Sequence, residues 1–418
     1  MEPDTANQGG AILPDWLGGI AMLLAAAFGL AWLLRRSGFP GAAAVGGVLA
    51  GLLLGPGVLG RAAPAMHDRL FGAAPIERTA WRDAERAVDA TRFAVGQAEV
   101  DPASAREQVE TLVSEAEARR AVWTAAVERK REPFLMLAFA LGLAVLLASG
   151  LAPPEGNSRQ SRANGRAITL GAWTAFLPAV LAAVGLGWLG EPAWSPTMLA
   201  AMAAVAFGAW PLVAADREPL RDSVPGGLAT LRTAALVANA IAIGFLGASA
   251  IVASHPLAPL GLAGAAVAGV LVPPLARSIG SEGRSMAAIP FLVPPLAALA
   301  AVRIEPFLDP RWAPVIVLAL IAEDGRWLGG TLGSWLPGGL RFPVALRVGL
   351  ASIPAGPGMV AAIAIGLQAG VLTPTVGAGL LVGVLVIEIL APIRTRFAAD
   401  LARTAARTGA GTDDRGGS

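Results

Sequence analysis

The sequence predicts an all-helical protein that crosses a membrane many times, and three observations support this fold class. Of its 418 residues, 55% are apolar, the mean hydropathy is +0.61, and only 15% are charged, against roughly a quarter in soluble domains. Apolar stretches of about 20 residues, the length at which a helix crosses a bilayer, recur along the chain. The 51 glycines and 32 prolines fit this class, because membrane helices tolerate both residues.

The composition also excludes several kinds of chemistry. The chain has no cysteine and two histidines, His67 and His255, which argues against disulfides, thiol catalysis and Cys- or His-rich metal sites. Both histidines lie in expected loops outside the spans. We therefore expect a protein that is not an enzyme and that holds no metal or cofactor.

We expect about eleven membrane-spanning helices from the length of the apolar stretches. The first stretch is not a signal peptide, because it follows an acidic segment and its apolar part is too long. The expected spans cover residues 12–34, 40–60, 133–152, 167–190, 197–215, 233–254, 257–276, 286–302, 313–336, 346–366 and 373–393.

The arginines predict the orientation of these spans. They gather in alternate loops, beginning with Arg35 and Arg36 and ending with Arg394 after the last span, while the short loops on the other side hold only Arg303 and Arg311. Basic residues are enriched on the cytoplasmic side of membrane proteins. The N-terminus is therefore expected outside and the C-terminus in the cytoplasm.

Residues 61–132 interrupt the apolar pattern with alternating acids and bases. Apolar residues recur there at helical spacing, which predicts two helices, about 76–99 and 103–131, that form a hairpin on the outer side. Two interpretations remain open. The hairpin is either a solvated unit that packs on itself or an arm for dimerisation or a periplasmic partner.

These features divide the chain into four parts. Two membrane helices precede the charged hairpin, the remaining membrane domain follows it, and a polar tail that we expect to be disordered ends the chain. The four parts are residues 1–60, 61–132, 133–397 and 398–418.

Two of the expected spans contain residues that break helices at membrane depth. The breaks consist of Gly208 and Pro211 in the first half of the chain and of Gly356, Pro357 and Gly358 in the second. Paired interruptions of this kind are typical of inverted-repeat transporters that hold a substrate at the bilayer midplane. The alternative is two ordinary proline kinks.

Several of these segments resemble the monovalent cation:proton antiporter superfamily. The resemblance is closest to the bacterial branch of sodium/proton antiporters and glutathione-gated potassium efflux systems. It implies a bacterial-type inner membrane, a homodimer, and two interrupted helices that cross at a site for H⁺ and Na⁺ or K⁺. The segments that carry it are residues 38–60, 203–216, 235–244, 261–272, 320–336 and 347–397.

The chain departs from this family at the residues that carry protons. Where the relatives have a pair of acids, or Asn and Asp, this sequence has Ala238, Asn239 and Ala240. Asn239 can offer a carbonyl oxygen to a cation, but its amide does not titrate. The polar residues that the relatives have at their two breaks are also replaced here, at the second break by Ala355 and Pro357.

The charged residues that remain within the later spans are therefore the candidate site. Glu323, Asp324 and Arg326 lie in the span 313–336, and Glu388 lies in the last span. At a spacing of three residues Glu323 and Arg326 are expected to pair. That pairing leaves Asp324 as the preferred carrier, because an unpaired acid inside a membrane is costly and is kept for function. Glu388 is expected in a supporting role.

The sequence thus predicts a secondary transporter that exchanges H⁺ for Na⁺ or K⁺ by alternating access. In this mechanism Asp324 and Glu323 bind the ions in turn, and Asn239 and backbone carbonyls at the breaks complete the coordination. The missing acid pair favours an alternative, in which the antiporter-like scaffold does not transport and serves as a binding or sensory protein. A carrier of neutral solutes is a third hypothesis.

Overall fold

The computed structural model describes residues 15–71, 75–96, 102–150, 161–207, 227–252, 284–304, 312–352 and 357–413. These residues form helices and short turns, with no strand among them. The helices are α1 (Asp15–Arg36), α2 (Ala42–Leu54), α3 (Leu59–Ala62), α4 (Pro64–Phe71), α5 (Pro75–Gly96), α6 (Pro102–Gly150), α7 (Ser161–Trp188), α8 (Pro196–Ala206), α11 (Gly227–Val252), α13 (Arg284–Ala301), α14 (Trp312–Trp335), α15 (Phe342–Ser352), α16 (Pro357–Gln368) and α17 (Pro374–Asp413).

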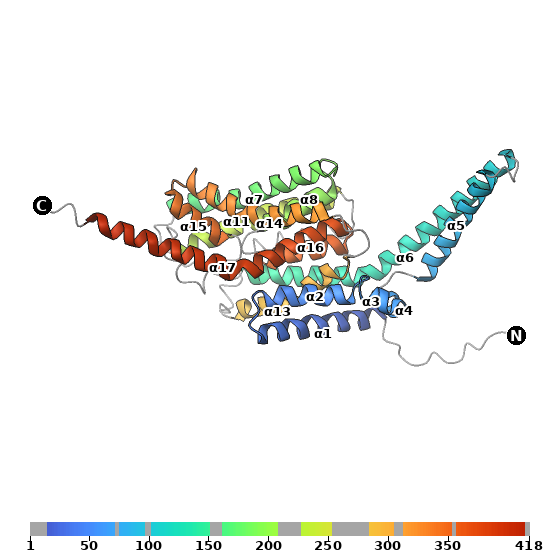
Figure 1. Cartoon of the computed structure of the whole chain (residues 1–418), viewed down its shortest axis with the longest axis horizontal. Helices are drawn as coiled ribbons and strands as arrows, with labels where there is room; N and C mark the ends of the chain where they lie inside the picture. Colours follow the sequence, from blue (N-terminus) through green and yellow to red (C-terminus); the bar gives the residue numbers. More distant parts are fainter. Residues whose placement is uncertain are drawn as a thin grey trace.

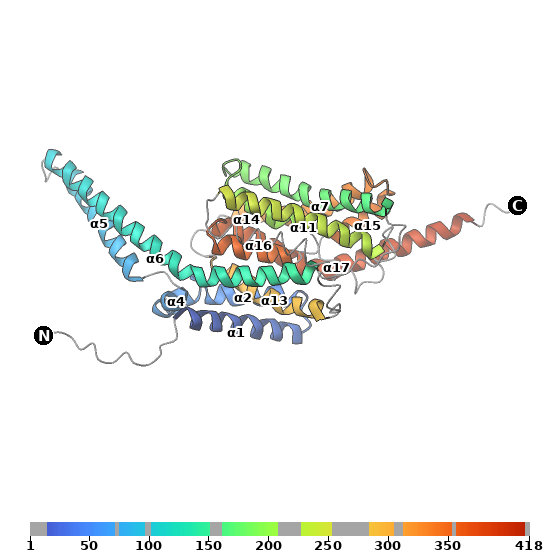
Figure 2. The same cartoon turned by 180° about the vertical axis from the view of Figure 1, so that it is seen from behind.

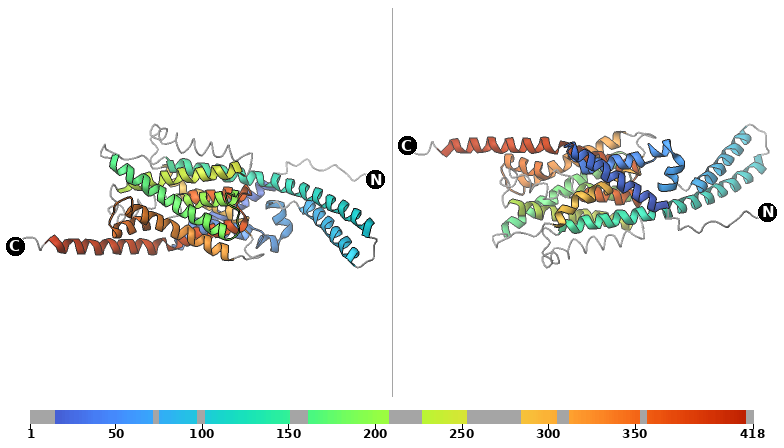
Figure 3. Two further views of the ribbon diagram at one scale, coloured as in Figure 1. Left: turned by 90° about the horizontal axis from the view of Figure 1, so that it is seen from above. Right: turned by 90° about the horizontal axis from the view of Figure 1, so that it is seen from below.

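Most of these helices run side by side in an elongated bundle, and two extensions leave it at opposite ends (Figures 1 and 2). At one end, which we call the hairpin end, α5 and the first half of α6 project as a pair. At the other, which we call the tail end, the C-terminal half of α17 projects alone. The views from above and below show the same arrangement (Figure 3).

Apolar helices confirm the membrane-like character of the chain. Four described stretches are long and apolar enough to cross a bilayer, namely Trp16–Arg36, Ala42–Ala62, Ala167–Trp188 and Pro374–Arg394. Shorter apolar helices occupy Pro196–Ala206, Val237–Ser249, Phe291–Ala301 and Gly358–Gln368. The expected span 257–276 lies outside the described residues.

The packing divides the bundle into two groups of helices, which are joined mainly by α16 and also by contacts of α17 with α2 and α13. In the first group α2 packs on both α1 and α13. In the second group α14 packs on α7, α15 and α17, while α11 packs on α7 and α8. The short helix α16 contacts α13 and α6 on one side and α8 on the other. A movement of one group against the other would therefore act on α16.

Two long helices differ from the sequence prediction. A hairpin helix ending near residue 131 and a separate span from 133 are expected, but α6 runs through both as one helix of 49 residues with Pro133 inside it. At 1.5 Å per residue this helix is about 75 Å long. At the other end of the chain a disordered tail is expected after 397, whereas α17 continues to Asp413.

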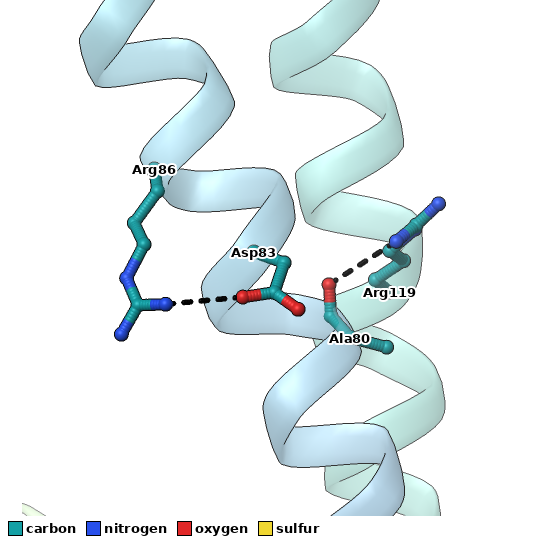
Figure 4. Close-up of polar contacts among 4 residues, drawn as sticks. All are labelled: Ala80, Asp83, Arg86 and Arg119. Atoms are coloured by element: carbon teal, nitrogen blue, oxygen red, sulfur yellow. Dashed lines mark hydrogen bonds and ion pairs between the residues drawn. The ribbon is translucent and has the colours of Figure 1, made fainter.

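The hairpin packs on itself through a small interface between α5 and α6. The rings of Trp81 and Trp123 stack at 5.0 Å between centroids, and Ala84, Val88 and Ala126 are buried. Arg119 also donates to the carbonyl oxygen of Ala80 at 3.3 Å (Figure 4). The neighbouring ion pair of Asp83 and Arg86 at 3.1 Å lies within α5 and is exposed, so it adds little stability (Figure 4).

Small residues let the helices of the second group approach closely. A Cβ atom added at Gly329 of α14 would lie 2.5 Å from the carbonyl oxygen of Trp173 on α7. One turn earlier, a Cβ atom at Gly325 would lie 2.8 Å from the Cβ of Pro178. Glycines at these positions bring the two backbones into contact, as is common between membrane helices.

We predict that Gly329→Leu destabilises the protein by at least about 1–3 kcal/mol, because the larger side chain must push α14 away from α7. The thermal unfolding midpoint of the purified protein in detergent measures the effect. Gly29→Leu is the control, since no atom lies within 4 Å of a Cβ at this exposed position of α1. Equal midpoints for the two variants would contradict the close contact.

Candidate functional site

The two interrupted segments of the sequence meet in the bundle. The first half-helix, α8, is capped at its start by Ser195, whose Oγ accepts a hydrogen bond from the backbone N–H of Met198 at 3.1 Å, and it ends at Ala206. The second, α16, begins at Pro357. A Cβ atom at Gly358 would lie 2.8 Å from the ring of Phe207, so the end of α8 touches the start of α16. Gly208, Pro211 and Gly356 lie outside the described residues.

Arg326 of α14 reaches into this junction and is fully buried, with 1% of its surface exposed. Its Nε donates to the carbonyl oxygen of Val205 at 3.1 Å. Its Nη2 donates to the carbonyl oxygens of Phe207 at 2.5 Å and Ala204 at 3.5 Å, and it lies 3.5 Å from the sulfur of Met359 on α16. One guanidinium therefore ties together α14, α8 and α16.

These carbonyls are the ones that a helix end leaves without a partner. The last four carbonyl groups of an α-helix have no intrahelical donor, and the helix dipole places about half a negative charge there. Such an end attracts a cation. Here Arg326 supplies the positive charge and the donors, so a fixed cation from the chain itself occupies the C-terminal end of α8.

The expected pair of Glu323 with Arg326 is wrong. Glu323 instead forms an ion pair with Arg394 of α17, and both side chains are only partly exposed. Arg394 also donates from Nη1 to the carbonyl oxygen of Ile387 at 3.2 Å, within the same helix. The reason is tertiary packing, because Arg326 is buried against α8 while Glu323 meets α17.

Asp324, the carrier that the sequence favours, is exposed on α14. The next residue along a helix is rotated by about 100°, which takes Asp324 out of the interface in which Glu323 lies. Exposed Asp324 therefore does not join the buried carbonyls at the junction of α8 and α16.

The remaining candidates lie elsewhere in the bundle. Asn239 is partly buried on α11, the helix that packs on α8 and α7. Glu388 is partly buried on α17 beside the start of α2, where a Cβ atom at Gly41 would lie 2.6 Å from its own Cβ. The side chain of Glu388 thus starts beside a helix N-terminus, where negative charge is favourable.

Sequence reasoning missed three parts of the site. Phe207 and Met359 look like ordinary apolar residues in the sequence, and Arg394 looks like one of the charges of the inner loops. A row of buried polar atoms also lies on α14 on a face about 100° around the helix from Arg326, comprising Trp327 Nε1, Thr331 Oγ1 and Ser334 Oγ, none of which has a hydrogen-bond partner among the described residues. The spacing of these residues at about one helical turn was the available signal.

Comparison with known families adds no assignment to this geometry, since no family model matches the chain and a search of curated proteins finds no significant match.

We predict that Arg326→Met lowers the free energy of unfolding by at least about 3 kcal/mol, because three buried carbonyls each lose a donor worth about 1 kcal/mol or more. Thermal unfolding in detergent measures the loss. Added guanidinium ion at low concentration should restore part of it by entering the space that Arg326 leaves. Arg341→Met, at an exposed position, is the matched control.

A double-mutant cycle tests the pair between α14 and α17. We expect Glu323→Gln and Arg394→Gln to be coupled by about 1–3 kcal/mol, because each group loses the same partner in a partly buried setting. Asp324→Asn should change the stability by less than about 0.5 kcal/mol, as surface changes usually do. A coupling energy near zero would show that the ion pair contributes nothing.

Proposed function

We propose that this chain is an antiporter-like membrane scaffold that does not transport ions through its central site and serves as a binding or sensory protein. The observation that carries the proposal is the position of Arg326 on the carbonyls of Ala204, Val205 and Phe207. A transported cation would need those oxygens. A guanidinium tethered to α14 cannot leave them and competes with any incoming cation.

The order of the helices supports the antiporter-like part of the proposal. Among the helices that the structure describes, a long helix, a short helix and a second long helix follow one another twice, as α7, α8 and α11 and as α14, α15 with α16, and α17. The two leading helices, α7 and α14, pack on each other, as the equivalent helices of two intertwined repeats would. We take this as an inverted repeat within about eleven spans, with the N-terminus outside and the C-terminus in the cytoplasm.

The positions of the acidic residues in the later helices support the proposal that the protein does not transport ions. Exchange of a proton for a cation needs a desolvated carboxylate that binds both in turn. Asp324 is exposed, and Glu323 is held by Arg394 rather than facing the junction. Asn239 is the residue at the position of the relatives' acid, and it does not titrate.

A second candidate function keeps ion exchange but moves the carrier to Glu323. It is favoured by the pair of Glu323 and Arg394, which lies partly buried between two apolar helices. In this case Na⁺ or K⁺ and H⁺ would bind Glu323 when Arg394 swings away towards the tail end. Asp324 would have no part in the cycle.

Large apolar side chains are exposed on α1, and they indicate which surroundings this helix requires. Phe28, Trp32 and Leu33 on α1 are 40%, 60% and 56% exposed, which suits either lipid or a second copy of the chain. A homodimer through α1 and a periplasmic partner on the α5–α6 hairpin belong to this proposal. The bilayer would be a bacterial-type inner membrane.

Proton flux in reconstituted vesicles separates the two functions. For the scaffold we expect that gradients of Na⁺ or K⁺ drive no more proton movement than in empty vesicles, at any pH. For the second function we expect flux that Glu323→Gln abolishes and Asp324→Asn leaves unchanged. Flux that depends on Asp324 would contradict both and would restore the carrier favoured by the sequence.

A further inference from the structure

Two arginines, one in a turn and one on a helix, meet at the hairpin end of the bundle, away from Arg326. Arg303 lies in the turn after α13, and Arg131 lies on α6 two residues before Pro133. Both are next to the C-terminal end of α16. The Nε of Arg303 donates to Gln368 Oε1 at 3.1 Å, and a Cβ atom at Gly370 would lie 3.8 Å from Arg131 Nη1.

Neighbouring groups hold Arg303 in a defined position. The carbon centre of its guanidinium lies 6.0 Å from the ring centroid of Phe134 on α6, at the range of a cation–π contact. Gln368, which is 1% exposed, donates from Nε2 to the carbonyl oxygen of Leu299 at 2.7 Å and so presents its own oxygen to Arg303. The guanidinium is therefore fixed before any ligand arrives.

These contacts leave one edge of the guanidinium available. The terminal nitrogens Nη1 and Nη2 of Arg303 make no hydrogen bond or ion pair with the residues that the structure describes. Arg303 as a whole residue is partly buried, and its guanidinium is largely desolvated. It offers two parallel N–H groups, the arrangement that binds two oxygens of one anion.

The surroundings make the positive charge of Arg303 costly. Burial, and next the positive charge of Arg131, lower the pKa of Arg303 to about 9. Arg303 therefore remains charged at neutral pH, although it is desolvated and lies near a like charge. An anion between the two arginines would offset both the desolvation of Arg303 and its repulsion from Arg131.

We propose that Arg303 and Arg131 bind a phosphate group at the hairpin end of the bundle, with the terminal nitrogens of Arg303 donating to two of its oxygens. Phosphate suits the site better than a carboxylate does, because its charge is spread over oxygens that point to both guanidinium groups. The phosphate is either free or part of a lipid headgroup, which would lie level with the ends of membrane helices. This inference does not depend on the proposed function.

Binding here would also act on α16. Gln368 ends this helix and contacts Arg303, while Gly358 and Met359 at the other end contact Phe207 and Arg326. An occupied site would hold the hairpin end of α16 against α6 and α13. The full-length protein should therefore unfold at a higher temperature when phosphate is bound.

The first measurement is thermal unfolding of the full-length protein in detergent during titration with inorganic phosphate, with chloride keeping the ionic strength constant. We expect the midpoint to rise and Arg303→Gln to raise the Kd at least about tenfold, since it removes charge-assisted hydrogen bonds. Arg131→Gln should raise the Kd as well. The Kd of Arg303→Lys should lie between the values for the unmodified protein and for Arg303→Gln, because lysine keeps the charge and loses the paired donors.

The second measurement is native mass spectrometry after reconstitution with phosphatidylglycerol. Retained lipid that is lost in Arg303→Gln, without a response to inorganic phosphate, identifies a lipid headgroup as the source. The control for both measurements is Arg86→Gln, which removes an exposed arginine from the hairpin. If neither probe binds, or if Arg303→Gln and Arg86→Gln respond alike, the proposal is wrong.

Discussion

The buried guanidinium of Arg326 is the interaction on which the centre of this structure depends. A helix that ends inside an apolar bundle leaves carbonyl groups that neither water nor lipid can satisfy at low cost. The chain ends α8 at Ala206, and Arg326 of α14 donates to the carbonyls of Ala204, Val205 and Phe207. The carbonyl groups at this helix end are thereby satisfied by a side chain of a neighbouring helix.

This interaction requires close packing around it. Arg326 can reach α8 because α14 lies directly against α7, and Gly325 and Gly329 make that approach possible. Nearer the start of α14, α17 approaches it closely at Gly379 and Gly383, where added Cβ atoms would meet Leu318 and Ala322. The glycines thus set the helix positions, and the helix positions determine which charged residues can meet. Glu323 finds Arg394 on α17 for this reason, although Arg326 is only three residues away.

The continuous helix α6 joins the charged hairpin to the bundle. A break at Pro133 would let the hairpin move independently, but the helix runs through it and packs on α13 and α16 further on. Arg131 and Phe134, on either side of Pro133, lie next to Arg303, which in turn contacts the last residue of α16. The hairpin, the buried arginines and the central half-helix therefore form one connected set of contacts.

Much of this protein follows from its sequence alone, because apolar length and periodicity report directly on a helix and on the solvent around it. The sequence predicts the helical class, the two hairpin helices and the positions of most helices. It also identifies the few charged residues that lie within apolar segments. The partners of those charges depend on tertiary structure. Spacing along one helix favours Glu323 with Arg326, but packing between helices buries Arg326 against α8, turns Glu323 to α17 and leaves Asp324 exposed. Which charged side chain of a helix is buried depends on which helices pack against it. The sequence pattern of a single helix does not contain that information.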